Sequence, residues 1–186
     1  GEISIQAPIT TTKNLDDFAH TSVTVTIKDK GKIITRKTVT AGHEITLSLE
    51  NPKLWSPEKP FLYDLHLSVE EQGSDQRDQI KSYFGIRETT VAKDKNGHLR
   101  LHLNGKPLFH WGTLDQGWWP DGLLTPRSEA AILSDIKFLQ DAGFNTIRKH
   151  IKVEPRRYYY HCDRMGMLVW QDQVSAKRSD DPPWPR

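Results

Sequence analysis

The sequence predicts an all-β sandwich over residues 1–91, followed by an α/β domain over residues 92–186. Two observations lead to this division. Up to residue 91, β-branched and apolar side chains alternate with polar ones at the two-residue period of half-buried strands. Beyond it, short apolar runs alternate with helical segments, which is the pattern of parallel strands joined by crossover helices.

The first part carries short strands separated by turns. We expect strands near residues 22–28, 32–40, 44–49, 62–70 and 79–88, with turns at Lys30-Gly31, Ala41-Gly42 and Gln72-Gly73-Ser74. Roughly seven short strands in about ninety residues is typical of a small antiparallel sandwich of immunoglobulin type. The segment Asn51–Pro60 interrupts them, because its three prolines exclude a central strand. Trp55 in this segment is interpreted as a plug against the sandwich, with sugar stacking as the alternative.

The α/β part opens with alternating Leu99, Leu101 and Leu103 between two turns, and residues 108–113 then read as a buried strand. A long loop at its carboxyl end contains Asp115, Trp118, Trp119 and Asp121. Carbohydrate sites combine aromatic faces, which stack on sugar rings, with carboxylates that accept from hydroxyls. The alternative is a loop whose tryptophans cover a neighbouring domain. Both readings stay open.

Two helices and two further strands complete the pattern. Thr125 as N-cap and Pro126 predict the start of the first helix, with Ile132, Ile136 and Leu139 as its buried stripe and Gly143 at its end. A strand within residues 143–150 follows. Pro155 then opens the second helix, Tyr158, Cys162 and Met165 form its buried stripe, and Gly166 ends it. The last strand runs to Trp170.

Four side chains fall at the carboxyl ends of these strands, where parallel α/β sheets place their chemistry. If Ile147 packs against the helices, alternation turns Arg148 and His150 toward the other face, and Trp170 and Asp172 likewise share a side. We interpret the four as a polar site with an aromatic wall. The alternative is a structural ion pair of Arg148 with Asp172, and a core role for Trp170.

Composition and charge restrict the classes of protein to which the chain can belong. The net charge is +2 and no block of like charges occurs, so nothing favours nucleic acid as a partner, and no apolar run is long enough to cross a membrane. The single cysteine, Cys162, excludes an internal disulfide and is interpreted as a small buried hydrophobe. The histidines lack metal-binding spacing, so we expect no metal site and no cofactor.

Longer motifs run through the chain: Leu54-Trp-Ser-Pro-Glu-Lys-Pro-Phe-Leu-Tyr63, Phe84-Gly-Ile-Arg-Glu88, Leu103-Asn-Gly-Lys-Pro107, Asp121-Gly, Asp141-Ala-Gly-Phe-Asn-Thr-Ile-Arg148 and Cys162-Asp-Arg-Met-Gly-Met-Leu-Val169. In these motifs the chain resembles glycoside hydrolase family 2, which includes β-galactosidases, β-glucuronidases, β-mannosidases and exo-β-glucosaminidases. It departs from many galactosidases at Arg148-Lys-His-Ile151, and Val169-Trp-Gln-Asp172 resembles the mannosidase-type branch. The sugar therefore stays open.

The resemblance implies an immunoglobulin-like sandwich followed by the first three strands of an incomplete (β/α)8 barrel. In the family, an arginine at the position of Arg148 lies near the catalytic carboxylates, and the segment around His150 lines the sugar pocket. The two catalytic glutamates of a retaining β-glycosidase would follow later strands, and no Asn-Glu pair occurs in this chain. The expected partners in a full-length protein are the remaining barrel, a jelly-roll domain and a carbohydrate substrate.

From this we expect a fragment, excised from a secreted or periplasmic β-glycosidase, that has no glycosidase activity alone. Because three strands cannot close a barrel, we also expect self-association or marginal stability. Two other classes stay open. One is a non-catalytic carbohydrate-binding or interaction module with Trp118 and Trp119 as its platform. The other is an unrelated α/β enzyme using Asp, His and Arg, although a phosphate-binding glycine loop is absent from the sequence.

Overall fold

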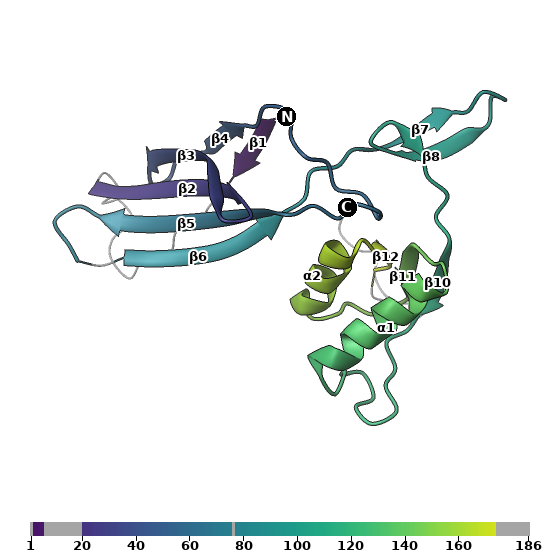
Figure 1. Cartoon of the computed structure of the whole chain (residues 1–186). Coiled ribbons are helices and arrows are strands. Elements are labelled where there is room, and N and C mark those ends of the chain that lie inside the picture. The colour runs from purple at the N-terminus through teal and green to yellow at the C-terminus, as the bar shows by residue number, and fades with distance from the viewer. Residues whose placement is uncertain (1, 6–19, 76, 174–186) are drawn as a thin grey trace, which may run out of the picture. The chain divides into compact units, whose positions relative to one another are not determined.

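The computed structural model describes residues 2–5, 20–75 and 77–173, which form mostly strands with two helices (Figure 1). The chain divides into two compact units. The first lies within residues 1–55 and 61–86, and the second within residues 56–60 and 87–186. This division lies slightly before the expected one after residue 91, because the strand that begins at Thr89 pairs with a strand of the second unit.

The first unit is built from antiparallel strands. A four-stranded sheet has the order β3-β2-β5-β6, and β1 pairs with β4. The bounds are β1 Glu2–Ile5, β2 Thr21–Asp29, β3 Lys32–Thr40, β4 Ile45–Ser48, β5 Tyr63–Glu71 and β6 Arg77–Phe84. Alternate residues of β2 and β4 meet in one core, which consists of Val23, Val25, Ile27, Ala41, Ile45, Leu47, Leu49 and Tyr63. The strand pattern expected for this part is confirmed within the described residues.

Trp55 is buried in the first unit, as its interpretation as a plug requires. Its backbone N–H donates to the carbonyl of Ile86 at 2.8 Å, which ties the proline-rich segment to the end of the sheet. Gly85 lies against the tryptophan, where an added Cβ would come within 3.3 Å of Trp55 Cβ. A buried indole cannot stack on a sugar, so the alternative for Trp55 is wrong.

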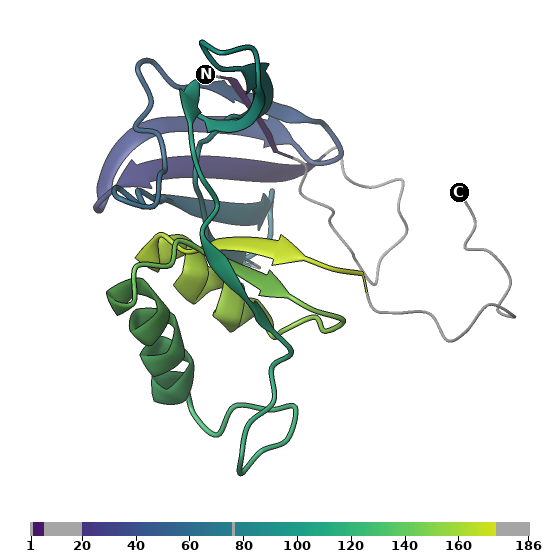
Figure 2. The ribbon, with the colours of Figure 1, turned by 90° about the vertical axis from the view of Figure 1, so that its right-hand side faces the viewer.

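The second unit begins with a small antiparallel sheet of β7 Thr89–Lys93, β8 Leu99–Leu103 and β9 Lys106–Pro107. Three parallel strands follow, in the spatial order β10-β11-β12 (Figure 2). Their bounds are β10 Gly112–Asp115, β11 Thr146–Lys149 and β12 Leu168–Gln171. The connections carry α1 Glu129–Asp141 and α2 Arg156–Met165.

Both helices pack on the same face of the parallel sheet. One core cluster joins residues of α1, α2 and β11 with Met167, which precedes β12. It consists of Ile132, Ile136, Ile147, Tyr158, Cys162 and Met167. Burial raises the pKa of the Cys162 thiol to about 12, so the cysteine behaves as a buried hydrophobe, as expected. No helix within the described ranges is both long and apolar enough to cross a membrane.

The predicted strand over residues 108–113 is confirmed only at Gly112 and Thr113, and the prediction that it is buried is wrong. β10 starts only at Gly112, and the preceding Phe109 and Trp111 are exposed. The reason is the side chain of Asn145, which accepts from the N–H of Trp111 and donates to the carbonyl of Phe109. These bonds to a side chain take the N–H of Trp111 and the carbonyl of Phe109, whereas the carbonyl of Trp111 still accepts from the backbone N–H groups of Asn145 and Thr146.

The first helix begins three residues later than its sequence signal. Ser128, not Thr125, is the N-cap, and its hydroxyl accepts from the N–H of Ala131 at 3.2 Å. The N–H of Thr125 is bonded to the carbonyl of Gly122, which keeps it in the preceding turn. The boundaries of α2 at Pro155 and Gly166 are confirmed, with Gly166 in the left-handed conformation that ends helices.

Burial within α1 gives a direct test of this packing. Ile136 is 0% exposed, whereas Phe138 on the same helix is 70% exposed. We predict that Ile136→Ala lowers the free energy of unfolding by about 2–5 kcal/mol, because it leaves a cavity in the core. Phe138→Ala, which deletes more apolar surface, should change it by only about 0.5 kcal/mol. Urea denaturation followed by circular dichroism measures both, and a larger loss for Phe138→Ala would contradict the arrangement.

Candidate functional site

In the part of the chain that the structure describes, both helices cover one face of the parallel sheet and no helix covers the other. Ile147 belongs to the helix-side core, so its neighbour Arg148 lies on the other face. The register places Leu114, Arg148 and Trp170 side by side across β10, β11 and β12. We call this row and the residues just beyond its carboxyl end the open face.

Arg148 and Asp172 meet on the open face. The guanidinium donates through Nε to Asp172 Oδ1 at 3.2 Å and through a terminal nitrogen to Oδ2 at 3.0 Å. The hydrogen bonds from Arg148 are the main cause that lowers the pKa of Asp172, and the charges of Arg148 and His150 act in the same direction. This ion pair between neighbouring strands is therefore charged at neutral pH and partly open to solvent.

His150 lies at the same edge of the sheet. Its backbone N–H donates to the carbonyl of Asp115, and its Nδ1 is 2.9 Å from the side-chain amide nitrogen of Gln116. The structure therefore brings His150 together with the loop that follows β10, and His150 lies near enough to Asp172 to act on its pKa. Its imidazole nitrogen Nε2 is left for other partners if Gln116 donates to Nδ1.

Trp170 is 49% exposed, so it is a wall of the open face and not a core residue. Its indole N–H donates to His110 Nδ1 at 2.9 Å, and the two rings meet edge to face. Burial lowers the pKa of His110, which keeps the accepting imidazole neutral. Both rings line an open cavity of about 1040 Å³ within the second unit.

The two tryptophans of the loop after β10 differ from one another. Trp118 is 64% exposed and available to a ligand. Trp119 is more enclosed, and its backbone exchanges two hydrogen bonds with Leu123 to form a tight turn. Its indole nitrogen is buried without a hydrogen-bond partner among the described residues. The loop thus presents the indole of Trp118 outward and is closed by backbone hydrogen bonds of Trp119.

Asp115 is not part of the open face. It follows Thr113 at the two-residue period and lies on the helix side, where Oδ2 contacts Lys149 Nζ at 2.6 Å. Its other oxygen accepts from the N–H of Gly117 at 2.6 Å. The structure therefore separates Asp115 from Arg148, and a role for Asp115 in binding substrate stays a prediction.

Sequence reasoning missed the charged residues on the helix side. Lys149 is 1% exposed and contacts both Asp115 and Glu154, while Lys152 contacts Glu154 at 2.9 Å. The signal was available in the alternation of β11, because Lys149 follows the buried Ile147 by two residues. A lysine at a buried position requires a carboxylate partner.

Two carboxylates on the helix side lie close together, since Asp115 and Glu154 share the ammonium of Lys149. Retaining glycosidases also use two close carboxyl groups, about 5–5.5 Å apart. Here the ammonium occupies the space between them, and Glu154 is buried. This pair is therefore a structural arrangement without room for a sugar.

Comparisons with known proteins agree on one family. The model of glycosyl hydrolases family 2 matches residues 1–87. An exo-beta-D-glucosaminidase from Amycolatopsis orientalis is 30% identical over 159 residues, covering 79% of this chain and 15% of the relative. A mannosylglycoprotein endo-beta-mannosidase from Lilium longiflorum is 34% identical over 129 residues, covering 65% of this chain and 13% of the relative.

Solved structures give the same result. The beta-glucuronidase of Parabacteroides merdae superposes with a TM-score of 0.73 at 27% identity, over 87% of this chain and 20% of that enzyme. The chain belongs to glycosyl hydrolases family 2, of which it represents a small part. Membership of this family excludes the reading as an unrelated α/β enzyme.

The Arg148–Asp172 pair makes a titration prediction. Because the pKa of Asp172 is lowered in the folded chain, the pair stabilises the fold above the ordinary aspartate pKa and stops doing so as pH falls through the lowered value. We expect the Asp172 carboxyl, followed by carbon-13 NMR, to titrate below the usual aspartate range of about 3.9. Arg148→Met should raise this midpoint, whereas Arg127→Met, which removes the exposed partner of Asp121, should leave it unchanged. An unaltered midpoint in Arg148→Met would disprove the pairing.

Proposed function

We propose that this chain is part of a retaining β-glycosidase that hydrolyses terminal β-linked sugars, and that its open face contributes contacts to the substrate. The observation that carries the proposal is the bidentate Arg148–Asp172 pair beside the half-exposed Trp170 at the carboxyl ends of parallel strands. Charged groups offer hydrogen bonds to sugar hydroxyls, and the indole offers an apolar face. The names of the relatives, which are β-glycosidases, support the same class.

We further propose that β10, β11 and β12 are the first three strands of a (β/α)8 barrel. Their spatial order follows the chain, and each connection carries a helix on the same face. Consecutive parallel strands with helices on one side are the repeating unit of such a barrel. The open face would then line the barrel interior, and His150 and Asp172 would lie at its catalytic end.

The isolated chain is proposed to lack glycosidase activity. Asp172 is engaged by Arg148, and Asp115 and Glu154 are engaged by lysines. None of these three carboxylates is placed as the acid and nucleophile pair that the retaining mechanism requires. We expect no release of aryl groups from aryl β-glycosides. Turnover that disappears when a residue of this chain is substituted would contradict the proposal.

A second function is favoured by the exposure of Trp118. The indole of Trp118 is 64% exposed and offers an apolar face on which a sugar ring can stack. A carbohydrate-binding or interaction role would use this loop and not the Arg148–Asp172 pair. The two functions therefore differ in which side chains respond to a sugar.

Sugar titration separates these functions. We predict that methyl β-glycosides at millimolar concentration shift the NMR signals of the Trp170 indole and the Arg148 guanidinium. Arg148→Met should weaken this binding about tenfold, as expected for the loss of a charge-assisted hydrogen bond. Lys137→Met, which removes an exposed ion pair on α1, is the matched control. Shifts confined to Trp118 would instead support the platform, and no shift at either place would refute the sugar-binding role.

We also propose that the isolated chain self-associates. Leu114 and Trp170 expose apolar surface on the open face, and in the described part of the chain β12 pairs only with β11. An unpaired strand edge beside apolar side chains is a template for association. We expect static light scattering to give a mass above that of one chain that rises with concentration. A compact monomer with a sharp thermal transition would contradict this.

A further inference from the structure

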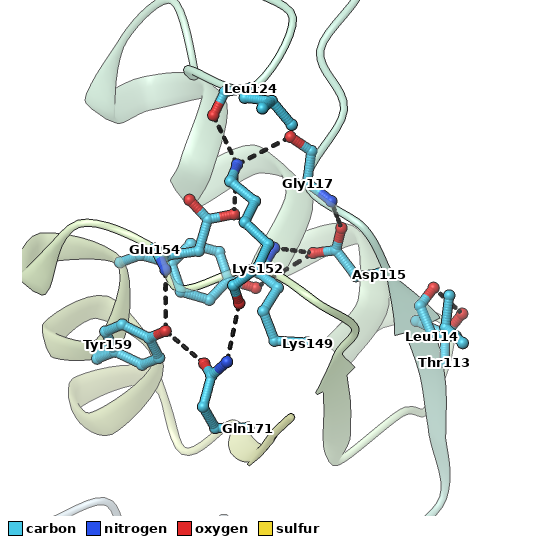
Figure 3. Close-up of polar contacts among 11 residues, drawn as sticks. Thr113, Leu114, Asp115, Gly117, Leu124, Lys149, Lys152, Glu154, Tyr159 and Gln171 are labelled. Atoms are coloured by element: carbon cyan, nitrogen blue, oxygen red, sulfur yellow. Dashed lines mark hydrogen bonds and ion pairs between the residues drawn. The ribbon is translucent and has the colours of Figure 1, made fainter. Parts of the chain in front are cut away.

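Four charged residues form a compact cluster on the helix side of the parallel sheet. We call Asp115, Lys149, Lys152 and Glu154 the lysine cluster (Figure 3). Its two ammonium and two carboxylate groups balance in charge. The cluster lies on the helix side, where β10 ends at Asp115 and β11 ends at Lys149, next to His150 in the chain.

Lys149 is the buried centre of the cluster. Its ammonium is 2.6 Å from Asp115 Oδ2 and 2.7 Å from Glu154 Oε1, and it lies 4.5 Å from the centre of the Tyr158 ring. Removing an ammonium from water is costly, and two carboxylates together with an aromatic face compensate for it. Lys149 therefore holds the ends of β10 and β11 together.

Lys152 differs from Lys149 in its partners, because its side chain contacts the loop of residues 116–124. Its ammonium donates to the carbonyl of Gly117 at 2.9 Å and to the carbonyl of Leu124 at 2.6 Å. Its third contact is Glu154 Oε1 at 2.9 Å. An ammonium has three donors, and here each has an acceptor. One side chain thus links both ends of the loop that presents Trp118.

The loop fits closely against this ammonium. Gly117 has φ +68°, and a Cβ at this position would come within 2.5 Å of both Lys152 Nζ and Glu154 Oε1. Asp115 also holds the N–H of Gly117. The backbone can approach the cluster this closely only because residue 117 is a glycine.

The segment that carries Lys152 is itself fixed to other elements. The carbonyl of Lys152 accepts from the side-chain amide of Gln171 in β12 at 2.8 Å, and the N–H of Glu154 donates to the hydroxyl of Tyr159 in α2 at 3.0 Å. Figure 3 shows these bonds on one side of the cluster and the loop carbonyls on the other. The loop is therefore connected through Lys152 to the strand that bears Trp170.

We propose that Lys152 is a positioning residue, which fixes the loop of residues 116–124 and thereby the direction in which Trp118 faces a carbohydrate. The carbohydrate part rests on the second proposed function, in which Trp118 is the binding platform, and the positioning of the loop does not. Surface loops are ordinarily mobile, and ordering one on binding costs free energy. Because Lys152 holds both ends of the loop beforehand, the indole is preorganised.

The test compares Lys152→Met with the wild-type chain by amide hydrogen exchange. Methionine keeps the length of the side chain and removes its three donors, while Glu154 keeps Lys149 as its partner. We expect the amides of Trp119 and Leu123 to exchange about tenfold faster or more, from the loss of charge-assisted hydrogen bonds. The amides of Ile147 and Val169 in the sheet should not change. Lys137→Met is the matched control and should alter neither group.

A second variant approaches the loop from its own side. Gly117→Ala places a methyl group against the ammonium, and we expect the same local increase in exchange. Unchanged exchange at Trp119 and Leu123 in Lys152→Met would overturn the proposal, as would faster exchange throughout the second unit, which would show a general structural role. If the wild-type loop binds methyl β-glycosides, Lys152→Met should weaken this binding. Absence of wild-type binding would refute the carbohydrate role, and the exchange result alone would then decide the positioning role.

Discussion

The pairing of β11 with its two neighbours is the constraint on which the second unit depends. Side chains alternate along a strand. The register that puts Ile147 into the helix-side core therefore puts Lys149 on the same side, and it puts Arg148 on the opposite face. A slip of one residue would exchange the two faces. It would bury Arg148 among apolar side chains and separate Lys149 from the carboxylates of Asp115 and Glu154. The core and both ionic arrangements therefore favour the same register.

The two faces use charge in different ways. On the helix side, Lys149 and Glu154 are almost completely buried, and each is balanced by an opposite charge. A buried ion pair adds little net stability, yet removal of one partner costs about 3–5 kcal/mol. Such a pair opposes alternative packings of the strand ends. On the open face, Arg148 and Asp172 remain partly solvated, and this is where we propose that a sugar binds.

Much of this architecture could be predicted from the sequence because it depends on the spacing of apolar residues along strands and helices and on local backbone requirements. The strands of the first unit, the buried stripe of α1 and the ends of α2 at Pro155 and Gly166 followed from such patterns. Alternation on neighbouring parallel strands predicted that Arg148 and Asp172 share a face, and their ion pair is the contact that the sequence analysis gave as the alternative to a site. The burial of Trp55 followed from its place in a proline-rich segment.

The errors arose where a hydrogen bond from another side chain overrides the local pattern. Asn145 bonds the backbone of residues 109–111 and delays the start of β10, and Ser128 caps α1 in place of Thr125. Asp115 pairs with Lys149, which lies on another strand and is therefore not visible in the sequence of the loop itself. The bonds of Lys152 to Gly117 and Leu124 depend equally on the folded arrangement.

The central claim is that the register of β11 creates a polar, aromatic-walled sugar site on the open face. A crystal structure of the chain soaked with a methyl β-glycoside tests it most directly. The account predicts electron density for the sugar against the Arg148–Asp172 pair and the indole of Trp170. Density on the opposite face of the sheet, or a structure in which Arg148 and Asp172 lie on different faces, would contradict it.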